Sequence, residues 1–133
     1  MPENIALLTA TAVHLGFQAT VTVLVYPALA RVPAAQWMSA HRAHSRAITP
    51  VVAVVYGSLL ITGGWALWSG ASAWTWITVF STAAAMLVTA LVAAPLHGRL
   101  GRGHNPGLVR QLLRADRLRT VAAAVALIAA LMR

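Results

Sequence analysis

The chain contains no cysteine and no lysine, and only two of its 133 residues are acidic. Without cysteine there can be no disulfide, thiolate nucleophile or iron–sulfur cluster, and without lysine there can be no Schiff base. The two acids, Glu3 and Asp116, are expected at opposite faces of the protein, so they cannot form the carboxylate pair of a glycosidase or an aspartic protease. A di-iron site is excluded because it needs several glutamates. Acid–base chemistry must therefore come from histidine.

Charge of either sign is scarce, and apolar residues dominate the composition. Charged residues make up 9% of the chain and hydrophobic residues 59%, a balance that indicates a membrane protein. A hydrocarbon layer of about 30 Å takes about 20 helical residues. The sequence therefore predicts a single all-α domain over residues 1–133, an integral membrane four-helix bundle. Its spans are expected at roughly Ile5 to Ala30, which is too long for a signal peptide, and at Ile48 to Trp68, Ser72 to Leu96 and Leu118 to Met132.

All ten basic residues are arginine, and nine of them lie between spans one and two, between spans three and four or, for Arg119, at the very start of span four. Loops rich in arginine stay in the cytoplasm. The chain is therefore expected to be a multi-pass protein of the inner (plasma) membrane with both termini outside. The net charge of +8 then points to anionic lipid headgroups and not to nucleic acid. The nine arginines are Arg31, Arg42, Arg46, Arg99, Arg102, Arg110, Arg114, Arg117 and Arg119.

A second helix is expected to begin about Ala34, after Pro33, and to lie at the membrane surface before it enters span two. One of its faces carries Trp37, His41, His44 and Ile48 at helical spacing. Proline inside a helix removes a backbone hydrogen bond, so a kink is expected at Pro50. Beyond the kink, the same stripe continues through Val52 to Tyr56.

Other local patterns describe how the spans begin and pack. Asn105 followed by Pro106 is typical of a helix start. Small residues recur every four positions in spans three and four, which allows close helix packing or a homo-oligomer. These small residues are Ser81, Ala85, Thr89 and Ala93 in span three, and Ala122, Ala126 and Ala130 in span four; Trp65, Trp68, Trp74 and Trp76 form an expected aromatic belt at the terminal face.

Histidines gather at the arginine face. His41 and His44 share a helix face, and His97 at the end of span three is expected on the same membrane side. Imidazole titrates near neutral pH, so these three residues are predicted to act as a proton-accepting catalytic centre. The alternative is that they only hydrogen-bond among headgroups. His104 lies in the following loop and is left out of the site. No metal or other cofactor is expected, because no carboxylate or thiolate accompanies the imidazoles.

A polar stripe follows span one, through Thr11, His14, Gln18, Thr22 and Tyr26. Ionisable residues inside a membrane usually face the bundle interior and mark function. His14, Gln18 and Tyr26 are therefore predicted to line a polar substrate pocket, with Trp37 and Tyr56 as its apolar wall. The alternative is hydrogen bonding from span one to Thr75, Thr78 or Thr82 of span three.

The remaining charged residues are expected to contact lipid or to form ion pairs. Arg110, Arg114 and Arg117 share one helix face and are expected to reach lipid phosphates. Asp116 is expected to pair with Arg119 or a neighbouring arginine, chiefly in a structural role.

Four short motifs resemble a known group of proteins: Tyr26-Pro27, AHRAHSRAITPVV at 40–52, PLHGRL at 95–100 and RLRT at 117–120. They look like those of small four-helix bacterial membrane proteins of largely unknown function, which are distantly similar to the anthrone oxygenase-like family. That resemblance implies oxidation of polycyclic anthrones to quinones by molecular oxygen without an evident cofactor. His97 departs from the family, which has asparagine after Pro-Leu.

Together, the residues and the resemblance suggest a small membrane enzyme that acts on a lipophilic, aromatic substrate, with the histidine cluster as its base. A cofactor-independent oxygenase of the anthrone type fits this description. Two alternatives remain open. One is a non-catalytic membrane subunit or binding protein that packs against a partner, and the other is a metal or haem protein with histidine ligands.

Overall fold

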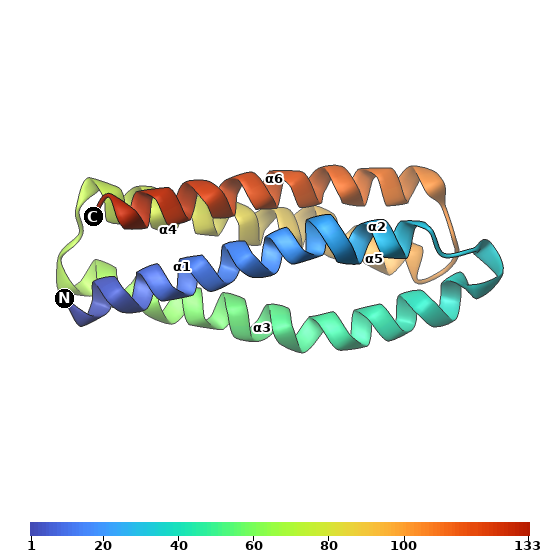
Figure 1. Ribbon diagram of the computed structural model, residues 1–133, viewed down its shortest axis with the longest axis horizontal. Helices are drawn as coiled ribbons and strands as arrows, with labels where there is room; N and C mark the ends of the chain where they lie inside the picture. Colours follow the sequence, from blue (N-terminus) through green and yellow to red (C-terminus); the bar gives the residue numbers. More distant parts are fainter.

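The computed structural model describes all residues 1–133 and contains helices only, arranged as four long rods side by side (Figure 1). This confirms the all-α, four-helix prediction. The first rod consists of α1 (Pro2–Thr20), the π-helix η1 (Val21–Val25) and α2 (Tyr26–Ala30); the second of the 3-10 turn η2 (Ala34–Gln36) and α3 (Trp37–Gly70); the third of α4 (Ala73–Val88), the π-helix η3 (Thr89–Ala93) and α5 (Ala94–Leu100); the fourth is α6 (Pro106–Leu131).

Three of the rods are long and apolar enough to cross a membrane, namely Pro2–Ala30, Ala34–Gly70 and Ala73–Leu100. The fourth rod, α6, is of comparable length but carries several charged residues in its first half. Many large apolar side chains point outward from the bundle, among them Val54, Ile61 and Leu91. Such a surface is what helices that face lipid present.

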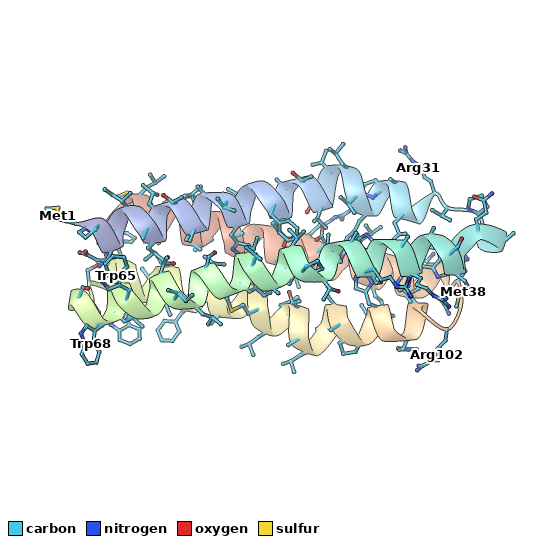
Figure 2. All side chains as sticks on the ribbon, turned by 90° about the horizontal axis from the view of Figure 1, so that it is seen from below. Met1, Arg31, Met38, Trp65, Trp68 and Arg102 are labelled. Atoms are coloured by element: carbon cyan, nitrogen blue, oxygen red, sulfur yellow. The ribbon has the colours of Figure 1, made fainter.

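Both termini lie at one end of the bundle, and the two arginine-rich connections lie at the other (Figure 1). Figure 2 shows Met1, Trp65 and Trp68 at the first end, and Arg31 and Arg102 at the second. The four tryptophans of the expected belt are all exposed. The grouping of arginine at one end and tryptophan at the other therefore agrees with the sequence pattern.

Local capping sets the helix boundaries. Ser72 and Thr75 form a reciprocal capping box at the start of α4, and the Asn105 side chain accepts a hydrogen bond of 3.1 Å from the Leu108 amide at the start of α6. Gly70 ends α3 with a φ of +130°, a conformation that only glycine adopts readily.

Proline shapes rods one and three in the same way. Each π-helix ends directly before a dipeptide whose second residue is proline. This dipeptide is Tyr26-Pro27 after η1 and Ala94-Pro95 after η3. Proline has no N–H and its ring meets the carbonyl four residues back, so the turn before it widens instead of ending the helix. Span one therefore continues past Tyr26-Pro27 to Ala30. Pro50, by contrast, causes no interruption: α3 runs unbroken from Trp37 to Gly70, and the expected surface helix and span two are one helix.

The chain thus consists of two helical hairpins of the same construction, although the sequence shows no obvious repeat. In each hairpin, a helix with a π-turn before a proline is followed by a connection and a long helix. The most extensive packing joins α4 to α6. The small-residue face of α6 differs from the expected one, because Ala123, Ala126 and Ala129, three residues apart, are buried, while Ala122 and Ala130 are only half-buried.

The larger apolar core lies toward the arginine end of the bundle. At its centre is Trp37, which is fully buried and donates a hydrogen bond of 2.9 Å from Nε1 to the Leu100 carbonyl. This bond ties the start of α3 to the end of α5. The same region also holds the histidines, so the core fixes the positions of the candidate site.

Candidate functional site

Three histidines meet between α3 and α5. Nε2 of His41 lies 3.1 Å from Nδ1 of His97, and the ring of His44 stacks on that of His97 with a centroid distance of 5.6 Å. His41 and His44 are one turn apart on α3, and the end of α5 brings His97 to them. The predicted convergence of the three imidazoles is therefore present in the structure.

A hydrogen-bonded chain runs from the interior of the bundle to this cluster. Arg119 donates from Nη2 to the Tyr26 hydroxyl at 3.2 Å, and that hydroxyl lies 3.0 Å from Nε2 of His97. Guanidinium can only donate. Because the Tyr26 hydroxyl accepts from Arg119, its own proton is free to go to His97, so Tyr26 donates to His97 and the Nδ1–H of His97 donates to His41. His97 then accepts at Nε2, on the side of the bundle interior.

An apolar chamber of about 260 Å³ lies beside this chain, close to the lower end of the usual size of ligand pockets. Its polar end is formed by Tyr26, His97 and Arg119, and no acidic residue lines it. Both π-helices contribute to the wall, which fits the tendency of such turns to occur at functional sites. The remaining lining residues are Phe17, Val21, Ser45, Ile48, Thr49, Val52, Thr89, Ala93 and Ala94.

A second cavity, of about 430 Å³, opens at the arginine end. It is polar, with His41, Arg42 and Arg102 among its lining residues. Only Ser45 and His97 line both cavities. The imidazole of His97 therefore stands between an apolar chamber inside the bundle and a polar cleft at its arginine end.

The polar stripe of the first rod faces inward, as predicted. Thr11, His14, Gln18 and Tyr26 are buried and Thr22 is half-buried. His14 stands edge-on to Tyr56 at 5.6 Å, and neither of its ring nitrogens has a hydrogen-bond partner, so the alternative bonds to Thr75, Thr78 or Thr82 are not formed. Neither His14 nor Gln18 lines the chamber or the cleft.

The expected apolar wall also differs in its residues. Trp37 stacks on His41 at 5.4 Å and meets His104 edge-on at 4.9 Å, while the Tyr56 hydroxyl lies 2.6 Å from Thr89 Oγ1. Both aromatic residues contact residues of the site without lining the chamber. Of the five residues predicted to bind substrate, only Tyr26 lines the chamber; the wall comes instead from Phe17, Ile48 and Val52. Ile48 and Val52 follow the histidines on the same helical stripe of α3, so the spacing in the sequence could have identified them as wall residues.

Asp116 and Arg119 form the predicted ion pair, at 2.8 Å, but not at the arginine face. Asp116 is 1% exposed and accepts hydrogen bonds of 2.6 Å from both Gln18 and Thr22. Because α6 begins at Pro106, ten residues earlier, Asp116 lies about 15 Å along the helix. The pair therefore lies inside the bundle. Arg119 belongs to the candidate site, although the sequence predicted it at the arginine face.

Nitrogens of His41 and His97 are directed at each other and at Tyr26, while Nε2 of His44 has no partner, and no three His, Cys, Asp or Glu side chains are grouped as metal ligands. The arrangement suits proton transfer along Tyr26, His97 and His41. No protein-family model, curated protein or solved structure matches the chain. Function is therefore inferred from the site itself.

Proposed function

We propose that this chain is a four-span protein of the inner (plasma) membrane, with its arginine end in the cytoplasm and both termini outside. Support comes from the apolar outer surface, from the position of the arginine-rich connections at one end and of four of the five tryptophans at the other, and from the burial of Asp116 and Arg119 away from lipid. The arginines around the cleft would then meet anionic lipid headgroups. The bilayer is thus the first partner of the protein.

Cysteine labelling tests this orientation against a clean background, since the chain has no native cysteine. Ala71→Cys lies in the connection between α3 and α4, and Gly103→Cys in the connection between α5 and α6. In intact cells, an impermeant thiol reagent should label Ala71→Cys, while Gly103→Cys should react only after the membrane is permeabilised. The reverse pattern would invert the topology and put the polar cleft outside.

We further propose that the protein is an enzyme that removes a proton from a lipophilic aromatic substrate bound in the chamber. The observation that carries this proposal is the position of His97, which lines both the apolar chamber and the polar cleft. A base at such a boundary can take a proton from a molecule in an apolar pocket and release it to water. Thr49 and Ala94 line the chamber and are exposed on the outer surface, so a lipophilic molecule can enter sideways from the bilayer.

The resemblance to the anthrone oxygenase-like family implies a further step after proton removal, namely oxidation of the substrate by molecular oxygen. Loss of one proton makes an anthrone electron-rich, and oxygen then attacks its activated ring carbon. Overall, one anthrone and one O₂ give one quinone and one water, so the electrons balance without a further redox partner. The protein would need only a base and an apolar pocket, the roles proposed here for His97 and the chamber.

Blocking the chamber tests this function. Thr49→Phe should place a ring at the entrance, and Ala53→Phe, one turn along α3 and also exposed, is the matched control outside the chamber. Quinone formation from anthrone-type substrates, measured in membranes under oxygen, should fall at least about tenfold for Thr49→Phe, on the scale of one misfitting contact in a pocket. Ala53→Phe should match wild type. Wild-type membranes inactive on every such substrate would contradict the oxygenase proposal.

A further inference from the structure

Arg119 is the only cation that lines the apolar chamber. Its side chain comes from α6, is 5% exposed and is held by three hydrogen bonds: Nη1 donates to Thr89 Oγ1 at 3.2 Å, and Nη2 donates to the Tyr26 hydroxyl at 3.2 Å and to Asp116 at 2.8 Å. The guanidinium carbon lies 5.9 Å from the centre of the Tyr26 ring. A positive group is thus fixed rigidly at the end of the chamber where His97 also lies.

These contacts leave Arg119 with unused capacity to donate. Guanidinium has five N–H groups, and its Nε is buried without any partner. An unpaired buried donor costs free energy, so such a group calls for an explanation such as an absent ligand. Of the other buried unpaired atoms in this region, those on His14, Gln18 and His44 do not line the chamber, whereas the Ser45 hydroxyl does. Arg119 is the only charged group among them that is both unpaired and at the chamber wall.

The charge of Arg119 is only partly compensated on the chamber side. Its one acidic partner, Asp116, also accepts hydrogen bonds from Gln18 and Thr22, and it does not line the chamber. A ligand in the chamber would therefore meet a cation and a hydroxyl, surrounded by apolar wall. In a site of low dielectric constant, a fixed positive group stabilises a developing negative charge strongly.

We propose that Arg119 and Tyr26 form a seat for one ionised oxygen of the ligand, so that the chamber takes a compact apolar molecule with an acidic hydroxyl, either a phenol or the enol of an aryl ketone. This inference rests on the proposed function in one respect, namely that His97 receives the proton. The Tyr26 hydroxyl and the Arg119 guanidinium together form this anion seat.

The proton transfer follows from the hydrogen-bonded chain. The O–H bond of the ligand breaks, its proton goes to the Tyr26 oxygen, and the Tyr26 proton goes to Nε2 of His97, 3.0 Å away. The electron pair stays on the ligand oxygen, where Arg119 balances the new charge. His97 passes its Nδ1 proton to His41, which lines the polar cleft, and the proton leaves to water there. No atom is oxidised or reduced in this step, so no oxidant is needed for it.

A pair of aromatic probes tests the anion seat without any turnover. The probe 2-naphthol has an acidic hydroxyl, and 2-methoxynaphthalene has nearly the same shape but no proton to lose. With the full chain in nanodiscs, 2-naphthol should bind at least about tenfold more tightly than the ether, because a site built around a hydroxyl rejects an analogue without it. Bound 2-naphthol should also show the absorption of the naphtholate at a pH at which the free probe is neutral.

Two variants isolate Arg119 in this assay. Asp116→Asn keeps Arg119, and Asp116→Asn/Arg119→Gln removes the cation while both buried partners stay polar, so the two differ only in the guanidinium. The naphtholate absorption should persist in the first and vanish in the second. Helical circular dichroism checks that each is folded. Tyr26→Phe gives a second measurement if the Arg119 variant unfolds, because loss of one donor of the anion seat should lower the ionised fraction of the bound probe.

The outcomes separate the two proposals. If wild type binds neither probe, the chamber is not a ligand site, and the proposed function and the anion seat both fail. If wild type binds both probes equally and 2-naphthol stays neutral, the chamber survives as an apolar pocket and the anion seat is refuted. Naphtholate absorption that persists in both Asp116→Asn/Arg119→Gln and Tyr26→Phe also refutes the seat.

Discussion

Replacing Arg119 by leucine should destabilise the folded protein by about 3–5 kcal/mol, the usual cost of removing one partner of a buried ion pair. The change leaves the carboxylate of Asp116 uncompensated at a position that is 1% exposed. It also removes donors from Tyr26 and Thr89. The measurement is the free energy of unfolding in mixed micelles, followed by helical circular dichroism during a titration with a denaturing detergent.

Two controls accompany this prediction. Arg117→Leu removes an exposed arginine two residues away and should change the free energy of unfolding by less than about 0.5 kcal/mol. The pair Asp116→Leu/Arg119→Leu should recover most of the lost stability, because apolar replacement of a whole buried pair is often neutral. Equal effects of Arg119→Leu and Arg117→Leu would show that the buried pair does not hold the bundle together.

Replacing His97 by glutamine should lower turnover of the proposed reaction by about 10²- to 10⁴-fold, the usual contribution of a general base. Glutamine can still bond to Tyr26 and His41 but does not titrate near neutral pH, so the fold and the binding of substrate should be retained. The assay is quinone formation in membranes, together with binding of 2-naphthol by the same variant.

His104→Gln is the matched control for His97, since His104 also belongs to the arginine end but lines neither cavity. Its turnover should equal that of wild type. His97→Asn is an informative companion, because the resemblance to the anthrone oxygenase-like family implies asparagine after Pro-Leu. Full activity of His97→Asn would refute the assignment of His97 as the base, whatever the substrate.

Features that depend on spacing along one helix could be predicted from the sequence. The inward stripe from Thr11 to Tyr26 follows from helical periodicity alone, and its members are buried except for Thr22, which is half-buried. The shared end of the two arginine connections follows from counting four helices. The meeting of His41, His44 and His97 could be predicted too, because all three lie near the same end of their rods.

Features that depend on depth and on packing between rods could not be predicted in the same way. The helix start at Asn105-Pro106 was predicted, but apolar content placed the start of the fourth span at Leu118 and so missed that the helix is already buried at Asp116. The chamber lies where two π-turns widen rods one and three. Their cause, a proline that continues a helix instead of ending it, is not distinguishable in sequence from a proline that stops one.

The charged first half of α6 has a consequence for how the protein is made. Asp116 and Arg119 are too polar for this helix to partition into lipid easily by itself. Their partners, Gln18, Thr22 and Tyr26, lie on the first rod, which is synthesised first. On the proposed membrane topology, we therefore expect the N-terminal rod to act as an intramolecular template for the last one, so that a chain without it would leave α6 outside the bilayer, exposed to quality-control proteases.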